Sequence, residues 1–260
     1  MNQPVHSFDV SLEEAKRIQS ELRGLVDLSD AIRDMDEIGL VGGADVAFLI
    51  APDDPHSLVH THSDHDRPLA EGSRRPRFNM RQASHALAGI VVLDRRSGEV
   101  VETVCATMPV MMPYIPGFLS FREGPAILRA LGELSHTPEV MVYDGCGIAH
   151  PRELGIASHL AVLTGIPSVG CAKSRLCGVC DEPDPERGRW TDIVFHDRIV
   201  GACLRTKTNV KPVFVSPGSG FSIDSARALV LSLATGYRLP EATRLAHRLV
   251  TRTKQGLNGT

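Results

Sequence analysis

Apolar and polar positions follow two patterns along this chain, which together predict an α/β fold. Continuous apolar runs, typical of buried strands, lie at 38–50, 138–145 and 166–173. Two β-rich runs, "LAGIVVLD" and "EVVETVCA", flank a turn that ends in Gly98, which is the pattern of a hairpin. A second hairpin is expected at 191–206 and a short strand at 212–220. Helix start and stop signals bound periodic segments at 125–134, 150–165, 222–236 and 240–252.

The order of these elements predicts a single domain that spans residues 1–260. One or two helices are expected within 10–35, where Ser11 and Glu14 form a capping box. Because the hairpin precedes alternating strands and helices, we expect a mixed central sheet, antiparallel first and parallel later. Residues 51–85 are rich in Pro, His, Asp and Arg and show no period, so a long surface loop is expected there.

Composition narrows the classes of function. Hydrophobic residues make up 42% and charged residues 23%, as in ordinary chains that bury a core. The net charge of −3 gives no general attraction to nucleic acid or membrane, so a polyanion would need a local basic surface or bound cations. No apolar run reaches the roughly 18–20 residues that span a bilayer, and the N-terminus lacks the pattern of a secretory signal. We therefore expect a cytoplasmic protein whose six cysteines are reduced thiols.

Three carboxylates stand in unusual places. Asp45 lies inside an apolar run, Asp144 ends another, and Glu123 precedes the helix expected from Pro125, where the helix dipole favours an anion. Either aspartate alone is also typical of a strand-end turn or a buried salt bridge. If the three converge they require a cation, and Mg²⁺, or Mn²⁺ in its place, suits carboxylate oxygens. Carboxylate-held Mg²⁺ beside a phosphate is the chemistry of phosphodiester cleavage.

Lys173 is a basic residue that, like Asp144, stands at the end of an apolar run. It ends the apolar run at 166–173, and Arg175 follows shortly after. A lysine at that place could neutralise a phosphate or the charge that develops in cleavage. A solvated lysine at a strand end fits its local sequence equally well.

The stretch "PYIPG" holds one aromatic side chain on a stiff loop. Pro113 and Pro116 fix their own φ angles, and Ile115 is restricted to extended conformations by the proline that follows it. Tyr114 is therefore held stiffly, which suits stacking on bases or wedging into the space that a displaced base leaves. A tyrosine that only packs the loop is the alternative.

A second loop, "DGCGIAHPR", could approach a flat ligand. Gly145 and Gly147 flank Cys146, and glycines let main-chain N–H and C=O groups come close to a bound base. A tight turn between a strand and a helix is the alternative. His150, before Pro151, is either a ligand contact or a residue at a helix start.

Taken together, "PYIPGFLSFREGP", "DGCGIAHPRELGIASHL" and "GCAKSRL" resemble, in this order, the endonuclease V family of deoxyinosine 3′-endonucleases. "GADVAF", "SPGSGFSIDSA" and "YRLPEATRLAH" also fit the family's pattern, so the resemblance covers nearly the whole chain except 51–85. It implies a ribonuclease-H-like fold with a mixed five-stranded sheet flanked by helices. It also implies a Mg²⁺-dependent DNA repair enzyme that cuts the second phosphodiester bond 3′ to deoxyinosine. We expect such a protein to act as a monomer.

The resemblance assigns roles residue by residue. The metal-binding acids match Asp45, Glu123 and Asp144, and the lysine of the catalytic site matches Lys173. The wedge that separates the strands matches Pro113, Tyr114, Ile115 and Pro116. The pocket for flipped hypoxanthine matches Gly117, Gly145, Cys146, Gly147 and His150.

The chain also departs from the family's pattern. Where the family usually has "PGHR" this chain has "PGSG", so Ser219 is expected in the place of an active-site histidine and Gly220 in that of an arginine. Cys146 stands where an amide residue is usual. The missing histidine leaves open a weak or inactive binder of inosine-containing nucleic acid. An inosine-specific ribonuclease is a further alternative, since inosine also occurs in RNA and a base pocket formed by main-chain groups need not sense the sugar.

Histidines and cysteines elsewhere suggest zinc only weakly. Structural zinc needs four ligands, and the Cys177–Cys180 pair would need Cys171 and Cys203 to complete a set. The tract "HTHSDH" is expected to be a solvated loop. His159 and His247 fall within expected helices and are interpreted as structural histidines.

Overall fold

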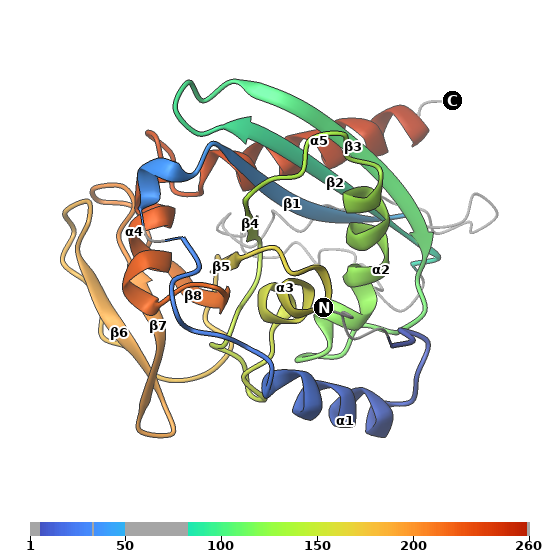
Figure 1. Ribbon diagram of the computed structural model, residues 1–260, viewed down its shortest axis with the longest axis horizontal. Coiled ribbons are helices and arrows are strands. Elements are labelled where there is room, and N and C mark those ends of the chain that lie inside the picture. Colours follow the sequence, from blue (N-terminus) through green and yellow to red (C-terminus); the bar gives the residue numbers. More distant parts are fainter. Residues whose placement is uncertain (1–5, 33, 50–82, 259–260) are drawn as a thin grey trace, which may run out of the picture.

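The computed structural model describes residues 6–32, 34–49 and 83–258, which form one eight-stranded sheet with helices on both faces (Figure 1). The strands are β1 (Leu40–Leu49), β2 (His85–Asp94), β3 (Val100–Pro109), β4 (Val140–Tyr143), β5 (Ser168–Ala172), β6 (Trp190–Phe195), β7 (Arg198–Leu204) and β8 (Val213–Ser219). The helices are α1 (Leu12–Arg23), the short 3₁₀ helix η1 (Met35–Glu37), α2 (Leu119–Gly132), α3 (Ile156–Thr164), α4 (Ile223–Leu233) and α5 (Glu241–Asn258).

The sheet is mixed, as expected, with the strand order β3-β2-β1-β4-β5-β8-β7-β6. β1 pairs antiparallel with β2 and parallel with β4, and β4 pairs parallel with β5. Both expected hairpins are confirmed as β2–β3 and β6–β7. The sheet has eight strands rather than five, because β8 adds antiparallel to β5 and the β6–β7 hairpin continues the same sheet beyond β8.

Two helices begin at other places than their sequence signals indicate. α2 begins at Leu119, so Pro125 lies inside the helix and not at its first position. Packing explains this start, since the residues from Ser120 to Gly124 are buried and tertiary contacts outweigh local helix preference. α3 begins at Ile156, after turns at 151–153, and ends at Gly165 in the left-handed conformation as expected.

The two faces of the sheet bury different helices. On one face α4 and α5 contribute to a core with Val41, Val91 and Val142. On the other, α2 and α3 pack against Ala44 and Ile90. The alternation of successive strand residues between the faces therefore decides which helix each β1 side chain meets. Of the loop expected at 51–85, residues 51–82 lie outside the described ranges, and its expected end is corrected because β2 already begins at His85.

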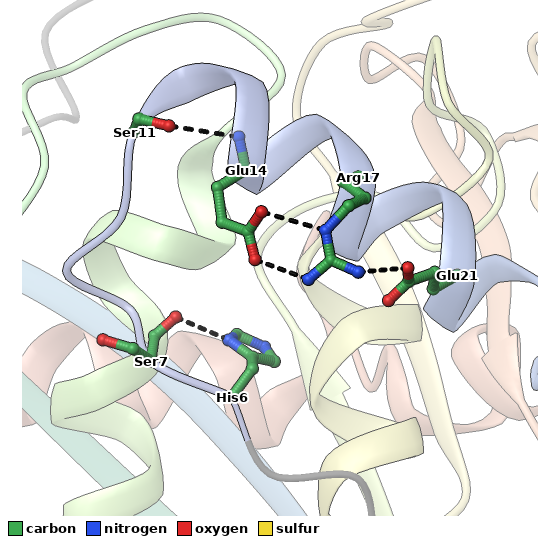
Figure 2. A network of polar contacts seen from close by, with 6 residues as sticks. All are labelled: His6, Ser7, Ser11, Glu14, Arg17 and Glu21. Carbon is green, nitrogen blue, oxygen red and sulfur yellow. Dashed lines mark hydrogen bonds and ion pairs between the residues drawn. The ribbon is translucent and has the colours of Figure 1, made fainter.

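α1 packs on α3 through a third group of buried side chains that includes Ile18, Leu22 and Leu154. Its N-terminus is capped as expected, since the Ser11 hydroxyl accepts a hydrogen bond from the Glu14 N–H at 3.2 Å (Figure 2). Figure 2 also shows Arg17 bonded to both Glu14 and Glu21 along the exposed side of the helix. In the described part of the chain, no helix combines the length and the apolar composition needed to cross a membrane.

Candidate active site

Asp144 and Lys173 meet because they end neighbouring parallel strands. Asp144 follows β4 and Lys173 follows β5, and the register places Tyr143 beside Gly170. The Lys173 Nζ donates to Asp144 Oδ2 at 2.6 Å. Burial works to lower the pKa of Lys173, but the charge and hydrogen bond of Asp144 and the charge of Asp45 together raise it. The ammonium therefore stays charged beside the carboxylate.

Asp45 faces α5 and meets a histidine there. Ala44 pairs with Tyr143 across the sheet, which sets Asp45 level with Asp144. From α5, His247 Nδ1 lies 2.8 Å from Asp45 Oδ2. Since a carboxylate accepts, Nδ1 carries the proton, and a neutral ring then presents the lone pair of Nε2. The sequence interpretation of His247 as a structural histidine overlooked this contact.

Close packing of α5 brings His247 to the sheet. A Cβ on Gly43 of β1 would lie 2.2 Å from the backbone of Ala242, and one on Gly89 of β2 would lie 2.6 Å from Val250. Because both strand positions are glycine, α5 can approach the sheet closely over Asp45, which pairs with Gly89. The two glycines within apolar strands were the signal in the sequence that a helix packs closely there.

Glu123 is the third carboxylate, and it projects from the second turn of α2. It is buried, with 8% of its surface exposed. Burial, followed by the charges of Asp45 and Asp144, raises its pKa well above the ordinary value. The expected stabilisation by a helix N-terminus is therefore outweighed, because α2 starts four residues earlier and desolvation dominates.

The donor set fits a hard divalent cation by its chemistry. Burial is also the largest cause of the raised pKa of Asp144, against which Lys173 works, while Asp45 raises it further. As they stand, no three His, Cys, Asp or Glu side chains in the described ranges are close enough to hold a metal ion. A cation that joined the carboxylates would take over the neutralising role of the Lys173 ammonium at Asp144.

A pocket of about 310 Å³ opens beside these groups. It brings together most of the residues that the sequence singled out, from β1, α2, the ends of β4 and β5, and the loop before α2. Among them, the lining includes Asp45, Tyr114, Ile115, Pro116, Gly117, Glu123, Asp144, Gly145, Cys146, His150 and Lys173. It also includes Ser120, Gly155 and Ile156, which sequence reasoning did not select. Pro113 and Gly147 are not part of the lining.

Tyr114 stands at the rim of the pocket on an anchored loop. Its side chain is 42% exposed, whereas Met112 and Phe118 on either side are buried. Arg122 fixes one end of the loop by donating to the Met112 carbonyl at 2.8 Å. The loop therefore presents an aromatic ring to solvent while its two ends are held in place.

Gly117 fixes the other end of this loop. It has a φ of +83°, and a Cβ there would lie 2.7 Å from Arg152 Nη2. Its carbonyl accepts from three side chains: Gln19 at 3.0 Å, His150 Nε2 at 3.1 Å, and Arg152. Burial lowers the pKa of His150 to about 4, so its ring is neutral and donates through Nε2. His150 thus supports the loop at the pocket wall.

The two glycines of the loop at 145–147 lie where an added Cβ would clash. A Cβ on Gly147 would lie 1.9 Å from the Pro217 carbonyl oxygen, and the Gly147 N–H donates to Ser216 Oγ at 2.8 Å. A Cβ on Gly155 would likewise lie 2.2 Å from the Cys146 carbonyl oxygen. Burial raises the pKa of Cys146 to about 12, so an uncharged thiol lines the pocket. Gly147 supports the pocket from behind.

Ser219 lies elsewhere, which corrects the expectation that it occupies the place of an active-site imidazole. Its Oγ accepts from the Asp27 N–H at 3.0 Å, at the end of β8, and it does not line the pocket. The imidazole beside the carboxylates comes from His247 instead. Gly220 has a φ of +76°, and a Cβ there would lie 3.0 Å from Pro167, so this position suits glycine.

The chain is similar to known proteins over most of its length. The family model described as Endonuclease V matches residues 77–248. Endonuclease V of Methanothrix thermoacetophila is 44% identical over 245 residues, which are 94% of this chain and 93% of that protein. The crystal structure of Endonuclease V from Streptomyces avermitilis has a TM-score of 0.78 and 36% identity, covering 99% of this chain and 96% of that one.

A more distant structure carries a nucleic acid. It is Ciona intestinalis Endonuclease V in complex with a 24mer DNA containing an inosine followed by a ribo-adenosine. It has a TM-score of 0.71 and 23% identity, covers 95% of this chain and 98% of that one, and supports the fold assignment alone. The family model and the close relatives together establish that this chain belongs to the Endonuclease V family.

Proposed function

We propose that this protein is a Mg²⁺-dependent DNA repair endonuclease that cuts the second phosphodiester bond 3′ to deoxyinosine. The observation that carries the proposal is one pocket lined by three carboxylates, a lysine, a glycine-rich loop and an exposed tyrosine at its rim. The acids and lysine suit phosphodiester hydrolysis, and the loop suits a flat base. Family membership supports the same chemistry.

Asp45, Glu123 and Asp144 would hold Mg²⁺, or Mn²⁺ in its place. When bound, the metal would supply Lewis-acid activation of water and stabilise the leaving oxygen. Lys173 would neutralise charge that develops on the phosphate, since its ammonium remains charged at this place. His247 would orient Asp45 through its Nδ1–H. Tyr114 would occupy the space that the displaced base leaves in the strand.

The alternative of a binder without turnover rested on the replacement of a histidine at Ser219. His247 beside Asp45 favours the enzyme. An inosine-specific ribonuclease remains a second outcome of the assay below, because main-chain groups in the pocket do not by themselves sense the sugar. We further propose that the protein acts as a monomer in the cytoplasm, where its six free cysteines would stay reduced.

A nicking assay tests this proposal. A duplex with one deoxyinosine, labelled at the 5′ end of that strand, is incubated with the protein in Mg²⁺, in Ca²⁺ and in EDTA. We expect a Mg²⁺-dependent product that ends one nucleotide beyond the inosine. Binding in Ca²⁺ without a cut in Mg²⁺ or Mn²⁺ would contradict the enzyme, and a cut only in the matching inosine RNA would favour the ribonuclease.

Tyr114→Ala is expected to weaken binding to the inosine duplex by about tenfold, because stacking on one base contributes on the order of 1–3 kcal/mol. Since 42% of the side chain is exposed, the free energy of unfolding should change little. Fluorescence anisotropy in Ca²⁺ and urea unfolding measure the two effects. Tyr114→Phe, which keeps the ring, is the control. Unchanged affinity in Tyr114→Ala would assign the ring to loop packing only.

His247→Ala is expected to slow cleavage by about 10–100-fold, the usual effect of removing a partner that orients a metal ligand. His247→Asn, whose amide nitrogen can stand near the place of Nδ1, should retain more activity. Single-turnover cleavage rates measure both. Ser219→Ala is the control and should cleave at the wild-type rate. A slow Ser219→Ala beside a normal His247→Ala would return the role to Ser219.

A further inference from the structure

A chain of hydrogen bonds leads from the N-terminal segment into the pocket. His6 Nε2 lies 2.7 Å from His159 Nε2, and His159 Nδ1 lies 2.8 Å from Ser120 Oγ. His159 is fully buried on α3, and its ring contacts the rings of His6 and Phe8, which also contact each other. Ser120 stands in the first turn of α2 and lines the pocket. None of these groups has a part in the cleavage chemistry described above.

The contact at His6 determines which atoms donate and which accept along this series of hydrogen bonds. His6 Nδ1 lies 2.7 Å from the carbonyl oxygen of Ser7, and the contact is drawn in Figure 2. A carbonyl only accepts, so His6 Nδ1 carries a proton. In its neutral form His6 has a single ring proton, which leaves Nε2 as an acceptor. The proton between the two Nε2 atoms then belongs to His159.

The inner end follows from the same rule. Burial, with smaller effects of His6 and His150, lowers the pKa of His159 to about 3, so this ring is neutral. With its one proton on Nε2, His159 Nδ1 is an acceptor and takes the Ser120 O–H. A serine hydroxyl has one proton and two lone pairs. Ser120 lines the pocket, although only 2% of its surface is exposed, and any further hydrogen bond that its Oγ forms with a ligand there must be accepted by the oxygen.

We propose that Ser120 is a specificity-determining residue that accepts the ring N–H of a lactam purine, and that His159 and His6 are positioning residues that fix its polarity. This inference rests on the proposed function. Hypoxanthine carries a hydrogen on N1, whereas adenine presents a lone pair there. An acceptor held in one orientation pairs with the first base and leaves two lone pairs opposed with the second.

The carbonyl of Gly117, on the loop before α2, is not available to accept the N1–H of the base. The Gly117 oxygen already accepts from Gln19, His150 and Arg152, which exceeds its two lone pairs. Ser120, in the first turn of α2, therefore supplies an acceptor for N1–H that this backbone carbonyl does not supply. Guanine also has an N1–H, so Ser120 separates lactam purines from adenine and not hypoxanthine from guanine.

The test measures base discrimination rather than activity. Labelled single strands that carry deoxyinosine, deoxyadenosine or deoxynebularine are titrated at pH 8 in Ca²⁺. Nebularine, the unsubstituted purine, has a lone pair at N1 and no group at position 6. We expect Ser120→Ala to lower the inosine-to-nebularine affinity ratio about tenfold, since the acceptor for N1–H is lost. Ser120→Thr, which keeps a hydroxyl, should restore the ratio.

His159→Phe tests the orientation of the Ser120 hydroxyl. If His159 only filled space, this variant would not change the base preference. Its ring fits the aromatic surroundings, but the Ser120 hydroxyl loses its acceptor and can turn to donate into the pocket. Affinity for the nebularine strand should then rise while affinity for the inosine strand falls. His6→Phe, near the surface, should shift the ratio in the same direction by less. Ser158→Ala is the matched control, because its Oγ is buried and has no hydrogen-bond partner among the described residues.

Three results would overturn the inference, and they can be told apart. If the wild type prefers inosine and Ser120→Ala keeps the wild-type ratio, the role of Ser120 is wrong and the proposed function stands. If the wild type binds the inosine and adenosine strands equally, the proposed function fails together with the inference. A ratio that falls as much in Ser158→Ala as in Ser120→Ala also contradicts it.

Discussion

Glu123→Gln is expected to abolish cleavage and, in the absence of divalent cations, to unfold at a higher temperature than the wild type. Glu123 is buried beside Asp45 and Asp144, and burial and both charges raise its pKa. The amide removes a charge that destabilises the metal-free fold, for which we expect a gain of about 1 kcal/mol. It also removes a metal ligand, so cleavage should fall by more than about 100-fold.

The pH dependence of this gain has a definite sign. A carboxyl whose pKa is raised by folding binds its proton more tightly in the folded state. Below the ordinary value of 4.5 both states are protonated, and the carboxyl and the amide should be equally stable. As the pH rises through the raised pKa of the folded state, the wild type loses stability relative to Glu123→Gln. Above that pKa the difference is constant.

Urea unfolding in EDTA at several pH values, compared between the two proteins, isolates this contribution from that of other titrating groups. Addition of Mg²⁺ should raise the stability of the wild type and have much less effect on Glu123→Gln. Glu133→Gln, at the exposed end of α2, is the control for loss of a carboxylate. A Glu123→Gln protein that is less stable than the wild type at pH 7 in EDTA would show that the carboxylate is favourable where it lies.

Gly147→Ala is expected to destabilise the protein by about 3 kcal/mol, at the upper end of what an added methyl costs in a filled interior. Its Cβ would lie 1.9 Å from the Pro217 oxygen and 2.4 Å from the Pro217 carbonyl carbon, which are backbone atoms. The loop at 145–147 would have to move, and its bond to Ser216 would lengthen. Affinity for the inosine strand should fall as well, because Gly145 and Cys146 line the pocket.

The midpoint of urea unfolding, with an unchanged m-value, measures this loss. Gly132→Ala is the matched control, since nothing lies within 4 Å of a Cβ at that helical position. It should be neutral or slightly stabilising, because alanine is the better helix former. A Gly147→Ala protein within 0.5 kcal/mol of the wild type, which is about the effect of an ordinary surface change, would mean that the loop yields freely.

Local patterns determined much of the fold and part of the site. Apolar runs placed β1, β4 and β5, and the turn at Gly98 placed the β2–β3 hairpin. Asp144 and Lys173 each end an apolar run, and the pairing of β4 with β5 brings them together, because neighbouring parallel strands end at the same edge of a sheet. The stiffness of the loop at Tyr114 likewise follows from the two prolines beside it.

The tertiary structure decided which helix faces which side chain. His247 meets Asp45 because Gly43 and Gly89 let α5 approach the sheet, a relation between segments about 200 positions apart that no local pattern contains. α2 begins at Leu119 because packing outweighs the preference of Pro125 for a helix start. The hydrogen bonds that join His6, His159 and Ser120 connect three segments that lie far apart in the sequence. Local sequence sets backbone preferences, whereas proton positions and the raised pKa of Glu123 depend on burial that only the assembled chain creates.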